Sequence, residues 1–234
     1  MKLPMKIGAA VMLLLMIVVE GAGPASGPDV LVDKQVHLGI PGQWEWESFK
    51  GRPVDATRLE IRFQGKANAA AQTLKIWQQD VKLPWPVLLN GKPVGALVTS
   101  ETALENLLTL PPGALQDAEN VLTVEAPPTL DDIEVGPVSL HPEPIKEVLK
   151  EASLEVTVVD KFNGKGVPCR LTLTKVDGTL QPILAEPAGA VALRVGICYT
   201  GDGKAQLSVP VGDYVLHAGR GSEWECGTDR NSLG

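Results

Sequence analysis

Short stretches in which apolar and polar residues alternate dominate the pattern of this chain. In RLEIRF (residues 58–63) the three apolar side chains share one face of an extended chain and the three charged ones share the other. A period of two is typical of a half-buried strand. QTLKIWQQD, PWPVLLNGKPVGAL, NVLTVEA and DIEVGPVSL follow at short intervals, and Asn90-Gly91 predicts a tight hairpin because both residues accept positive φ.

The alternation is interrupted once, at EPIKEVLKEA. Pro144 suits a helix start, and Ile145, Val148 and Leu149 have helical spacing, so a short helix and an extended linker both fit. Strand-like runs then resume with SLEVTVVD and continue to DYVLHAGRG, with Asp-Gly turn signals between them.

These runs predict an all-β chain of two tandem antiparallel β-sandwiches behind an N-terminal signal helix. Residues 28–141 are expected to form a jelly roll, 142–153 a linker, and 154–224 a smaller transthyretin-like or Ig-like sandwich. Residues 225–234 are polar without periodicity, so a disordered tail is expected there.

The N-terminus has the charged, apolar, small order of a secretory signal peptide. Lys2 and Lys6 precede an apolar run over residues 7–19, and GAGPASG follows, with Ala25 as the expected last residue before cleavage. Thirteen apolar residues fall short of the roughly 20 that span a bilayer. We therefore expect a signal peptide over residues 1–25 and an exported protein, periplasmic, cell-surface or extracellular; an uncleaved anchor is the alternative.

Composition narrows the classes of partner. The 234 residues carry a net charge of −7, with 21 basic and 28 acidic side chains and no block of like charge. Nucleic acids and anionic membranes select clustered Lys and Arg, so neither is expected as a partner, apart from a membrane held through an uncleaved signal segment.

Cysteine and histidine are too sparse and scattered to indicate a metal centre. They are Cys169, Cys198, Cys226, His37, His141 and His217. No spacing among them matches a metal motif, and Cys169 alternates with apolar residues as a core position would. No catalytic cofactor is expected, and whether any disulfide forms is left open.

Indole rings and polar side chains in loops are the candidates for ligand binding, because an indole stacks on the apolar face of a sugar while polar groups hold its hydroxyls. The candidates are Trp44, Trp46, Trp85, Asp80 and Asn90. Packing of the indoles and a turn role for Asn90 are the alternatives. Asp131 and Asp132 are candidates for a structural calcium site or for turn capping.

Two parts of the chain resemble known modules. TLKIWQQDVKLPWPVLLNGKPVGAL, ENVLTVEA and DDIEVGPVSL resemble a galactose-binding-like jelly roll. LEVTVVDKFNGKGVPCRLTLTKVDG and VGICYTGDGKAQLSVPVGDYVLHAGRGSEW resemble a carboxypeptidase-regulatory-like, transthyretin-type sandwich. In tandem behind a signal peptide, over about residues 28–224, they resemble the front half of secreted metallohydrolases of the polymerase-and-histidinol-phosphatase type.

That resemblance implies a catalytic domain opened by a His-x-His motif, which this sequence does not contain. No catalytic residue can therefore be carried over, and the chain is expected to stop before the chemistry, as a truncated or split gene product. A GxSxG nucleophile elbow is also missing. The sequence thus predicts a non-enzymatic accessory protein that binds carbohydrate or a catalytic partner; the alternative is a free-standing cell-surface structural or adhesion protein.

Overall fold

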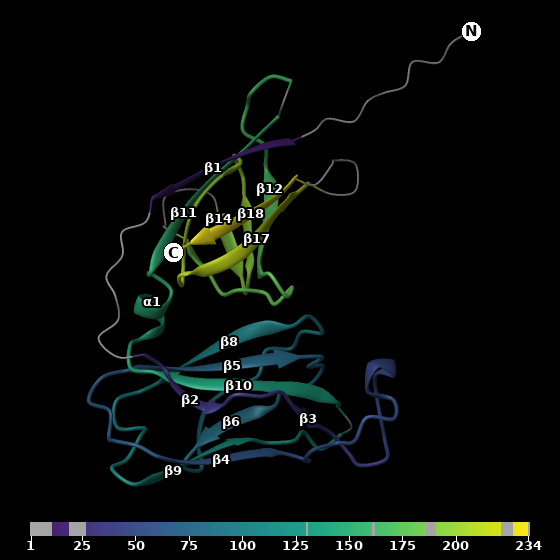
Figure 1. Ribbon diagram of the computed structural model, residues 1–234, viewed down its shortest axis with the longest axis vertical. Coiled ribbons are helices and arrows are strands. Elements are labelled where there is room, and N and C mark those ends of the chain that lie inside the picture. Colours follow the sequence, from purple (N-terminus) through teal and green to yellow (C-terminus); the bar gives the residue numbers. More distant parts are fainter. Residues whose placement is uncertain are drawn as a thin grey trace. The chain divides into compact units, whose positions relative to one another are not determined.

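The computed structural model describes residues 11–18, 27–129, 131–160, 162–185, 191–220 and 227–233, the first and last of these as backbone only. The chain divides into two compact units, Gly23–Val148 and Met1–Ala22 with Leu149–Gly234. Each unit contains two antiparallel sheets, so the prediction of an all-β chain of antiparallel sandwiches is confirmed (Figure 1).

The first unit, here called the first sandwich, has a five-stranded and a four-stranded sheet. The larger sheet has the order β2-β10-β5-β8, with β3 also paired to β10, and the smaller has the order β4-β9-β6-β7. The elements are β2 (Asp29–Val32), β3 (Val36–Leu38), the 3₁₀ helix η1 (Glu47–Phe49), β4 (Leu59–Gln64), β5 (Gln72–Gln79), β6 (Pro86–Leu89), β7 (Lys92–Ala96), β8 (Leu104–Leu110), β9 (Glu119–Val124), β10 (Ile133–His141) and helix α1 (Ile145–Val148).

The core of the first sandwich is made by the alternating positions that the sequence singles out. Leu59 and Ile61 of β4 are buried while Glu60 and Arg62 are exposed or partly exposed. Burial on one face at a period of two stabilises the strand through apolar area removed from water. Trp77 of β5 is buried too, as packing in a strand requires.

The expected hairpin is present between β6 and β7. Asn90 and Gly91 have φ of 53° and 74°, the left-handed conformation that such a two-residue turn requires. The side chain of Asn90 also joins neighbouring backbone, so this turn fixes the register of the smaller sheet.

The second unit, here called the second sandwich, pairs the sheets β1-β11-β16-β13 and β14-β15-β12-β17-β18. Its strands are β1 (Val11–Val18), β11 (Ala152–Asp160), β12 (Cys169–Lys175), β13 (Leu184–Ala185), β14 (Val191–Arg194), β15 (Ile197–Thr200), β16 (Lys204–Val209), β17 (Gly212–Gly219) and β18 (Gly227–Leu233). Cys169 and Cys198 are buried in its core as free thiols, which confirms the core position of Cys169. Cys226 lies outside the described residues.

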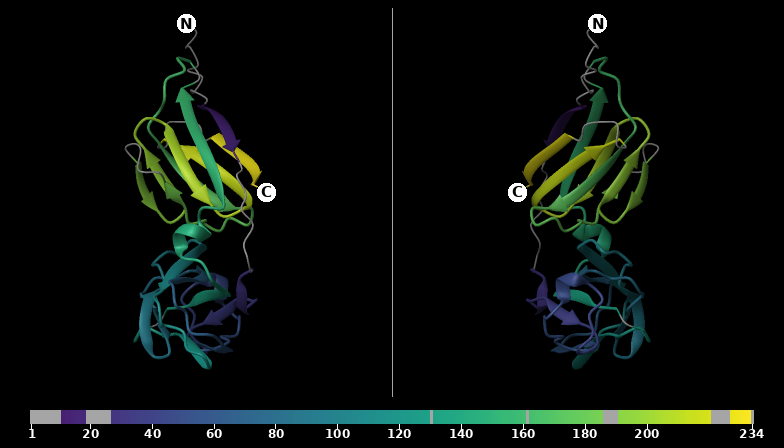
Figure 2. Two further views of the ribbon diagram at one scale, coloured as in Figure 1. Left: turned by 90° about the vertical axis from the view of Figure 1, so that its left-hand side faces the viewer. Right: turned by 90° about the vertical axis from the view of Figure 1, so that its right-hand side faces the viewer.

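Two segments differ from expectation. Val11–Val18, expected within the signal helix, form strand β1, antiparallel to β11; the views in Figure 2 show β1 in purple beside β11. Gly227–Leu233, expected in a disordered tail, form β18, which pairs with β17. In both cases the partner is a strand with an open edge, whose N–H and C=O groups pair with any extended segment in reach. The rest of the expected signal peptide and the remaining tail residues lie outside the described residues.

The predicted linker contains the short helix α1, and β11 already begins at Ala152. Among the described residues, no helix combines the length and hydrophobicity that crossing a membrane requires.

Candidate functional site

A long loop projects from one end of the first sandwich and carries two of the candidate tryptophans. Residues 39–56, here called the tryptophan loop, connect β3 to the approach to β4. The two ends of the loop are tied together: the backbone N–H of His37 donates to Asp55 Oδ2 at 2.9 Å, and that of Gly39 donates to the Ala56 carbonyl at 3.1 Å. The base of the loop is therefore held to β3.

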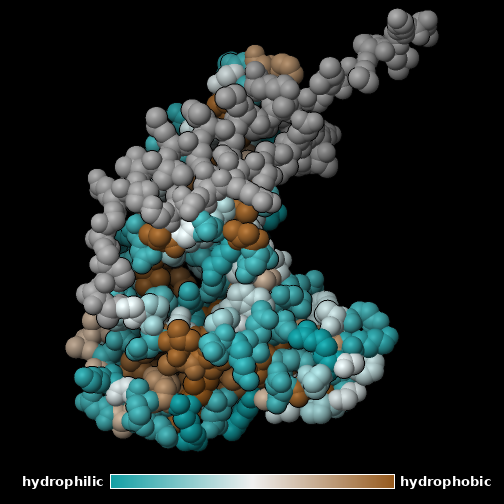
Figure 3. Space-filling model, in the orientation of Figure 1, coloured by the Kyte–Doolittle hydropathy of each residue, from teal (hydrophilic) through white to brown (hydrophobic). Residues whose placement is uncertain are grey.

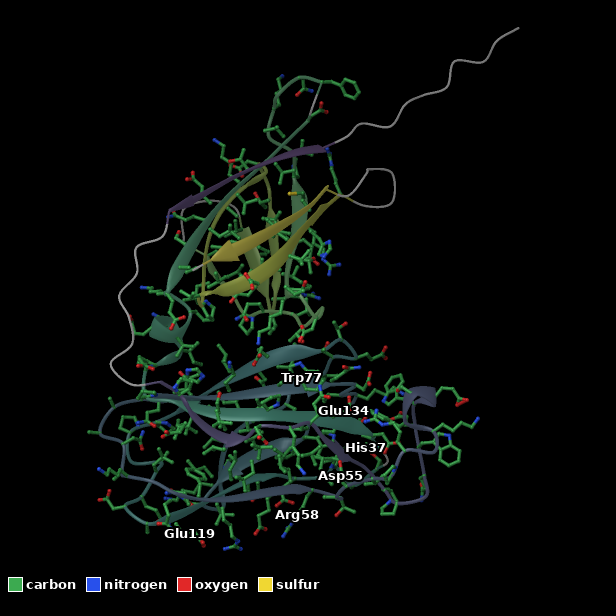
Figure 4. The ribbon with its side chains drawn as sticks, viewed as in Figure 1. His37, Asp55, Arg58, Trp77, Glu119 and Glu134 are labelled. Atoms are coloured by element: carbon green, nitrogen blue, oxygen red, sulfur yellow. The ribbon has the colours of Figure 1, made fainter. Side chains whose placement is uncertain are left out.

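Aromatic packing holds the middle of the loop. Phe49, in η1, is buried and its ring stacks on that of His37, with centroids 4.3 Å apart. The Arg52 guanidinium lies over the Phe49 ring, 5.1 Å from its centroid. It also forms a hydrogen-bonded ion pair with Glu134 of β10. Figure 4 shows His37, Asp55 and Glu134 gathered where the loop leaves the sheet.

Asp132 is the buried anchor beneath the loop. Its Oδ2 accepts a hydrogen bond from the Glu45 backbone N–H at 2.6 Å, and its Oδ1 lies 3.7 Å from His37 Nε2. A side chain at Gly39 could not be accommodated, since its Cβ would lie 1.9 Å from Asp132 Oδ1. Glycine at 39 therefore permits the close approach of loop and carboxylate.

Polar atoms with unused hydrogen-bonding capacity concentrate at this anchor. His37 Nδ1 lies 3.0 Å from the Pro53 carbonyl, which can only accept, so Nδ1 donates and carries a proton. Five buried side-chain N and O atoms have no hydrogen-bond partner among the described residues, and four of them lie here: His37 Nε2, Glu45 Oε2, Trp46 Nε1 and Asp132 Oδ1. Because buried polar groups in folded proteins are nearly always paired, with protein atoms or with water, these four atoms mark a polar interior beneath the loop.

The two indoles of the loop differ in exposure. Trp44 is 48% exposed, which leaves its ring available as a flat apolar surface. Trp46 is partly buried, with the Lys82 ammonium 4.3 Å from its ring centroid. Lys82 also donates to Glu45 Oε1 at 2.5 Å, and this bond raises the pKa of Lys82. Trp44 is thus the indole that a ligand can reach.

The side chains of Asp131 and Trp85 are hydrogen-bonded to each other. Trp85 is buried, and its Nε1 donates to Asp131 Oδ2 at 2.9 Å, as does the Leu83 backbone N–H. Burial is the largest cause of the raised pKa of Asp131, and the neighbouring Glu45 carboxyl raises it further. Trp85 therefore belongs to the core, in place of the ligand contact considered from the sequence.

Asp80 lies at the same end of the sandwich, directly after β5, with φ of 61°. Its pKa is raised, first by burial and then by the nearby carboxylates of Glu134, Glu101 and Asp131. Burial is thus the main reason that the charged form of Asp80 is disfavoured, and the neighbouring carboxylates add to it.

Asn90 belongs to the fold and not to the tryptophan loop. Its Oδ1 accepts from the Val121 N–H at 2.9 Å, and its Nδ2 donates to Asn120 Oδ1 at 2.9 Å and to the Ala114 carbonyl at 3.2 Å. These bonds occupy the groups that a ligand would need.

The two aspartates considered for calcium point to different partners: Asp131 to N–H donors at residues 82–85, and Asp132 to the tryptophan loop. Within the described ranges, no three His, Cys, Asp or Glu side chains come together as a metal would require. The calcium site therefore remains a prediction, and the observed bonds of Asp131 favour turn stabilisation.

Sequence reasoning missed the contributions of His37, Glu45 and Arg52. His37 was weighed only as a metal ligand, and its role depends on Asp132, which is distant in sequence. The local signal that could have found the site is the long unpatterned stretch after VHLG, which interrupts the strand alternation at two indoles.

No protein-family model matches this chain, and no curated protein matches it. Solved structures similar to it include a GH2 β-galacturonidase from Eisenbergiella tayi, at 11% identity and a TM-score of 0.25, over 97% of this chain and 44% of that one. A β-glucuronidase from Faecalibacterium prausnitzii matches at 12% identity and a TM-score of 0.21, over 97% and 47%. A glycosyl hydrolase family 2 member from Bacteroides cellulosilyticus matches at 12% and 0.24, over 96% and 36%.

The chain thus spans less than half the length of these glycosyl hydrolase chains. At such TM-scores the matches carry no argument about activity, and the β-sandwich architecture rests on the sheets described above. None of them supports an origin in a metallohydrolase, which stays a prediction from sequence.

Proposed function

We propose that this chain is a non-catalytic accessory protein that binds a neutral carbohydrate at the tryptophan loop. The observation that carries the proposal is the 48% exposed ring of Trp44, which precedes Glu45 in a loop whose base is polar. An indole face with polar groups next to it is the combination that sugar binding uses.

Charge supports a neutral ligand. Asp80, Asp131 and Asp132 lie at this end of the sandwich. The two cations of the loop, Lys50 and Arg52, and the neighbouring Lys82 are already paired with Glu47, Glu134 and Glu45. A sulfated or carboxylated sugar would meet excess negative charge without a free cation to offset it.

The test is a glycan-array screen of the purified protein, followed by calorimetric titration of the tightest neutral glycan. Trp44→Ala should weaken binding at least about tenfold, because it removes the stacking surface. Tyr199→Ala is the matched control, since Tyr199 is similarly exposed at 41% but lies on β15 of the second sandwich. Equal affinity of Trp44→Ala and the native protein, or binding confined to anionic glycans, would overturn the proposal.

Export is part of the same proposal, and it rests on the order of charged, apolar and small residues at the N-terminus. N-terminal sequencing of the protein recovered outside the expressing cell should begin at Ser26. Retention in the cytoplasm with an intact N-terminus would contradict export without bearing on carbohydrate binding. A continuation with a His-x-His motif in the nucleotide sequence downstream would favour the catalytic partner over a free-standing adhesion protein.

A further inference from the structure

The first sandwich contains a pocket at the end opposite the tryptophan loop. β10 runs from Ile133, which pairs with β3 next to the loop, to His141, so Leu140 lies at the far end of the sheet. The pocket has a volume of about 490 Å³, within the range of about 300–1,000 Å³ of small-molecule sites. Its lining comprises Asp29, Leu31, Phe63, Gln64, Gly65, Lys66, Gln72, Leu115 and Leu140.

The pocket opens where the edges of the two sheets face each other. β2 ends the order of the larger sheet and β4 ends that of the smaller, and both contribute to the lining. Figure 3 shows hydrophobic side chains gathered on the surface around β2 and β10. The interior of the sandwich is therefore accessible from this edge.

The inner wall of the pocket is apolar. Leu115 and Leu140 are buried, while Leu31 and Phe63 are only partly buried, although their strands turn them toward the core. Partly exposed Leu and Phe side chains in a concave site gain free energy when a ligand covers them. Phe63 presents the aromatic surface against which an apolar ring face can pack.

The rim of the pocket is polar and electrically balanced. Gln72 Oε1 is the fifth of the buried side-chain atoms that lack a hydrogen-bond partner among the described residues. Asp29 and Lys66 supply one negative and one positive charge, and neither is ion-paired with another described residue. Gln64 adds a second primary amide, with two donors and an acceptor.

We propose that this pocket is a second saccharide site, which takes a neutral ligand of one or two sugar rings. A sugar ring has an apolar face for Phe63 and the leucines, and hydroxyls that both donate and accept. Such hydroxyls pair with the amides of Gln64 and Gln72, both of which line the pocket, and with the two rim charges. A phosphorylated ligand would meet a carboxylate opposite the single ammonium, and an alkyl chain would leave the rim groups unpaired.

The pocket extends the proposed function, on which this inference builds, from one carbohydrate-binding site to two. A strand of nine residues, such as β10, is roughly 30 Å long, so the two sites lie about that far apart on one sandwich. Two weak sites at that separation bind a long glycan more tightly than either site alone.

The test uses the isotope-labelled full chain and backbone amide NMR, with glucose, galactose, mannose, cellobiose and lactose as probes. We expect at least one probe to shift the amide signals of Phe63, Gln64 and Gln72. Gln72→Met keeps the volume and removes the amide, so it should weaken this binding about tenfold. Gln35→Met makes the same change at an exposed position outside the pocket, and it should bind as the native protein does.

Further variants separate this proposal from the previous one. Trp44→Ala should leave the shifts at Gln72 intact, and Gln72→Met should leave binding at the Trp44 indole intact. Lys66→Gln, an exposed substitution that does not threaten folding, should also weaken pocket binding. A dipeptide and decanoate serve as comparison probes. Shifts at Gln72 from none of the five sugars, sugar-induced shifts unchanged in Gln72→Met and Lys66→Gln, or a response to the comparison probes alone would each overturn the proposal.

Discussion

The Asp131 side chain stabilises the fold through the hydrogen bonds that its oxygen accepts more than through its charge. Its Oδ2 accepts from Leu83 N–H and Trp85 Nε1, while its other oxygen faces the Glu45 side and makes only a long contact of 3.4 Å to the Lys82 N–H. The pKa of Asp131 is raised from 3.8, chiefly by burial.

The pH dependence of stability follows from this direction. Above about pH 4, Asp131 keeps its proton to a higher pH in the folded protein than in the unfolded chain. The contribution of this group to stability is therefore present at low pH and is lost as the pH rises through the folded pKa.

Asp131→Asn should therefore cost less than about 1 kcal/mol at pH 7, because an amide oxygen can keep the two good bonds and its NH₂ can face Glu45. Asp131→Leu should cost about 3 kcal/mol or more, because it leaves buried donors unpaired. Urea unfolding at pH 4.5 and pH 7 measures both. A difference between native protein and Asp131→Asn that does not change with pH would contradict this account.

The core cysteines should be chemically inert in the folded protein. Burial, followed by the proximity of Cys198, raises the pKa of the Cys169 thiol from 9.0 to about 11, and burial also raises that of Cys198. At pH 8 only about one Cys169 in a thousand would be a thiolate, about a hundredfold fewer than for an unperturbed thiol. Alkylation followed by peptide mass spectrometry should thus label Cys169 at least about a hundredfold faster in urea, and Cys198 faster as well. Equal labelling rates with and without urea would show that the second sandwich opens readily.

At the scale of elements, strand β18 replaces the disordered tail that was expected at the C-terminus. A polar segment without periodicity is expected to be dispensable, yet β18 pairs with β17 along its whole length from Gly227 to Leu233. Deleting residues 227–234 should speed hydrogen exchange of β17 amides and lower the unfolding free energy by about 1–3 kcal/mol. Exchange mass spectrometry and urea unfolding measure these effects. A change below about 0.5 kcal/mol with unchanged exchange would restore the interpretation of the segment as a loose tail.

Strands with their own alternation could be predicted from sequence, whereas strands defined by their partners could not. β4 buries Leu59 and Ile61 as its pattern indicates, and the Asn90-Gly91 turn joins β6 to β7. β1 has an apolar run that is equally compatible with helix, and the open edge of β11 decides between them. The same limit applies to the candidate site. Trp44 could be named as a candidate together with Trp46 and Trp85, but which ring is exposed depends on the packing. The role of Asp132 depends on a contact with Glu45, 87 residues earlier.

At the scale of the whole molecule, the two units should unfold separately. Each has its own apolar cluster, and the clusters share no residue. Calorimetry of the full chain should show two transitions, and Leu207→Ala, in the fully buried core of the second sandwich, should lower only one of them, by about 2–5 kcal/mol in unfolding free energy. Leu122→Ala is the matched change in the first sandwich. A single transition that both variants shift equally would show that the units unfold as one.

The pairing of β1 with β11 has a consequence in time. β1 leaves the ribosome early, but Ser153, the partner of Val18, is synthesised about 135 residues later. At roughly 5–20 residues per second, that interval lasts on the order of 7–27 seconds. Throughout it the apolar N-terminal segment has no β11 to pair with, so a targeting factor in the cell can capture it without competing against folding. Slower translation would lengthen this interval. Faster translation would shorten it, so that pairing with β11 would compete with capture by the targeting factor.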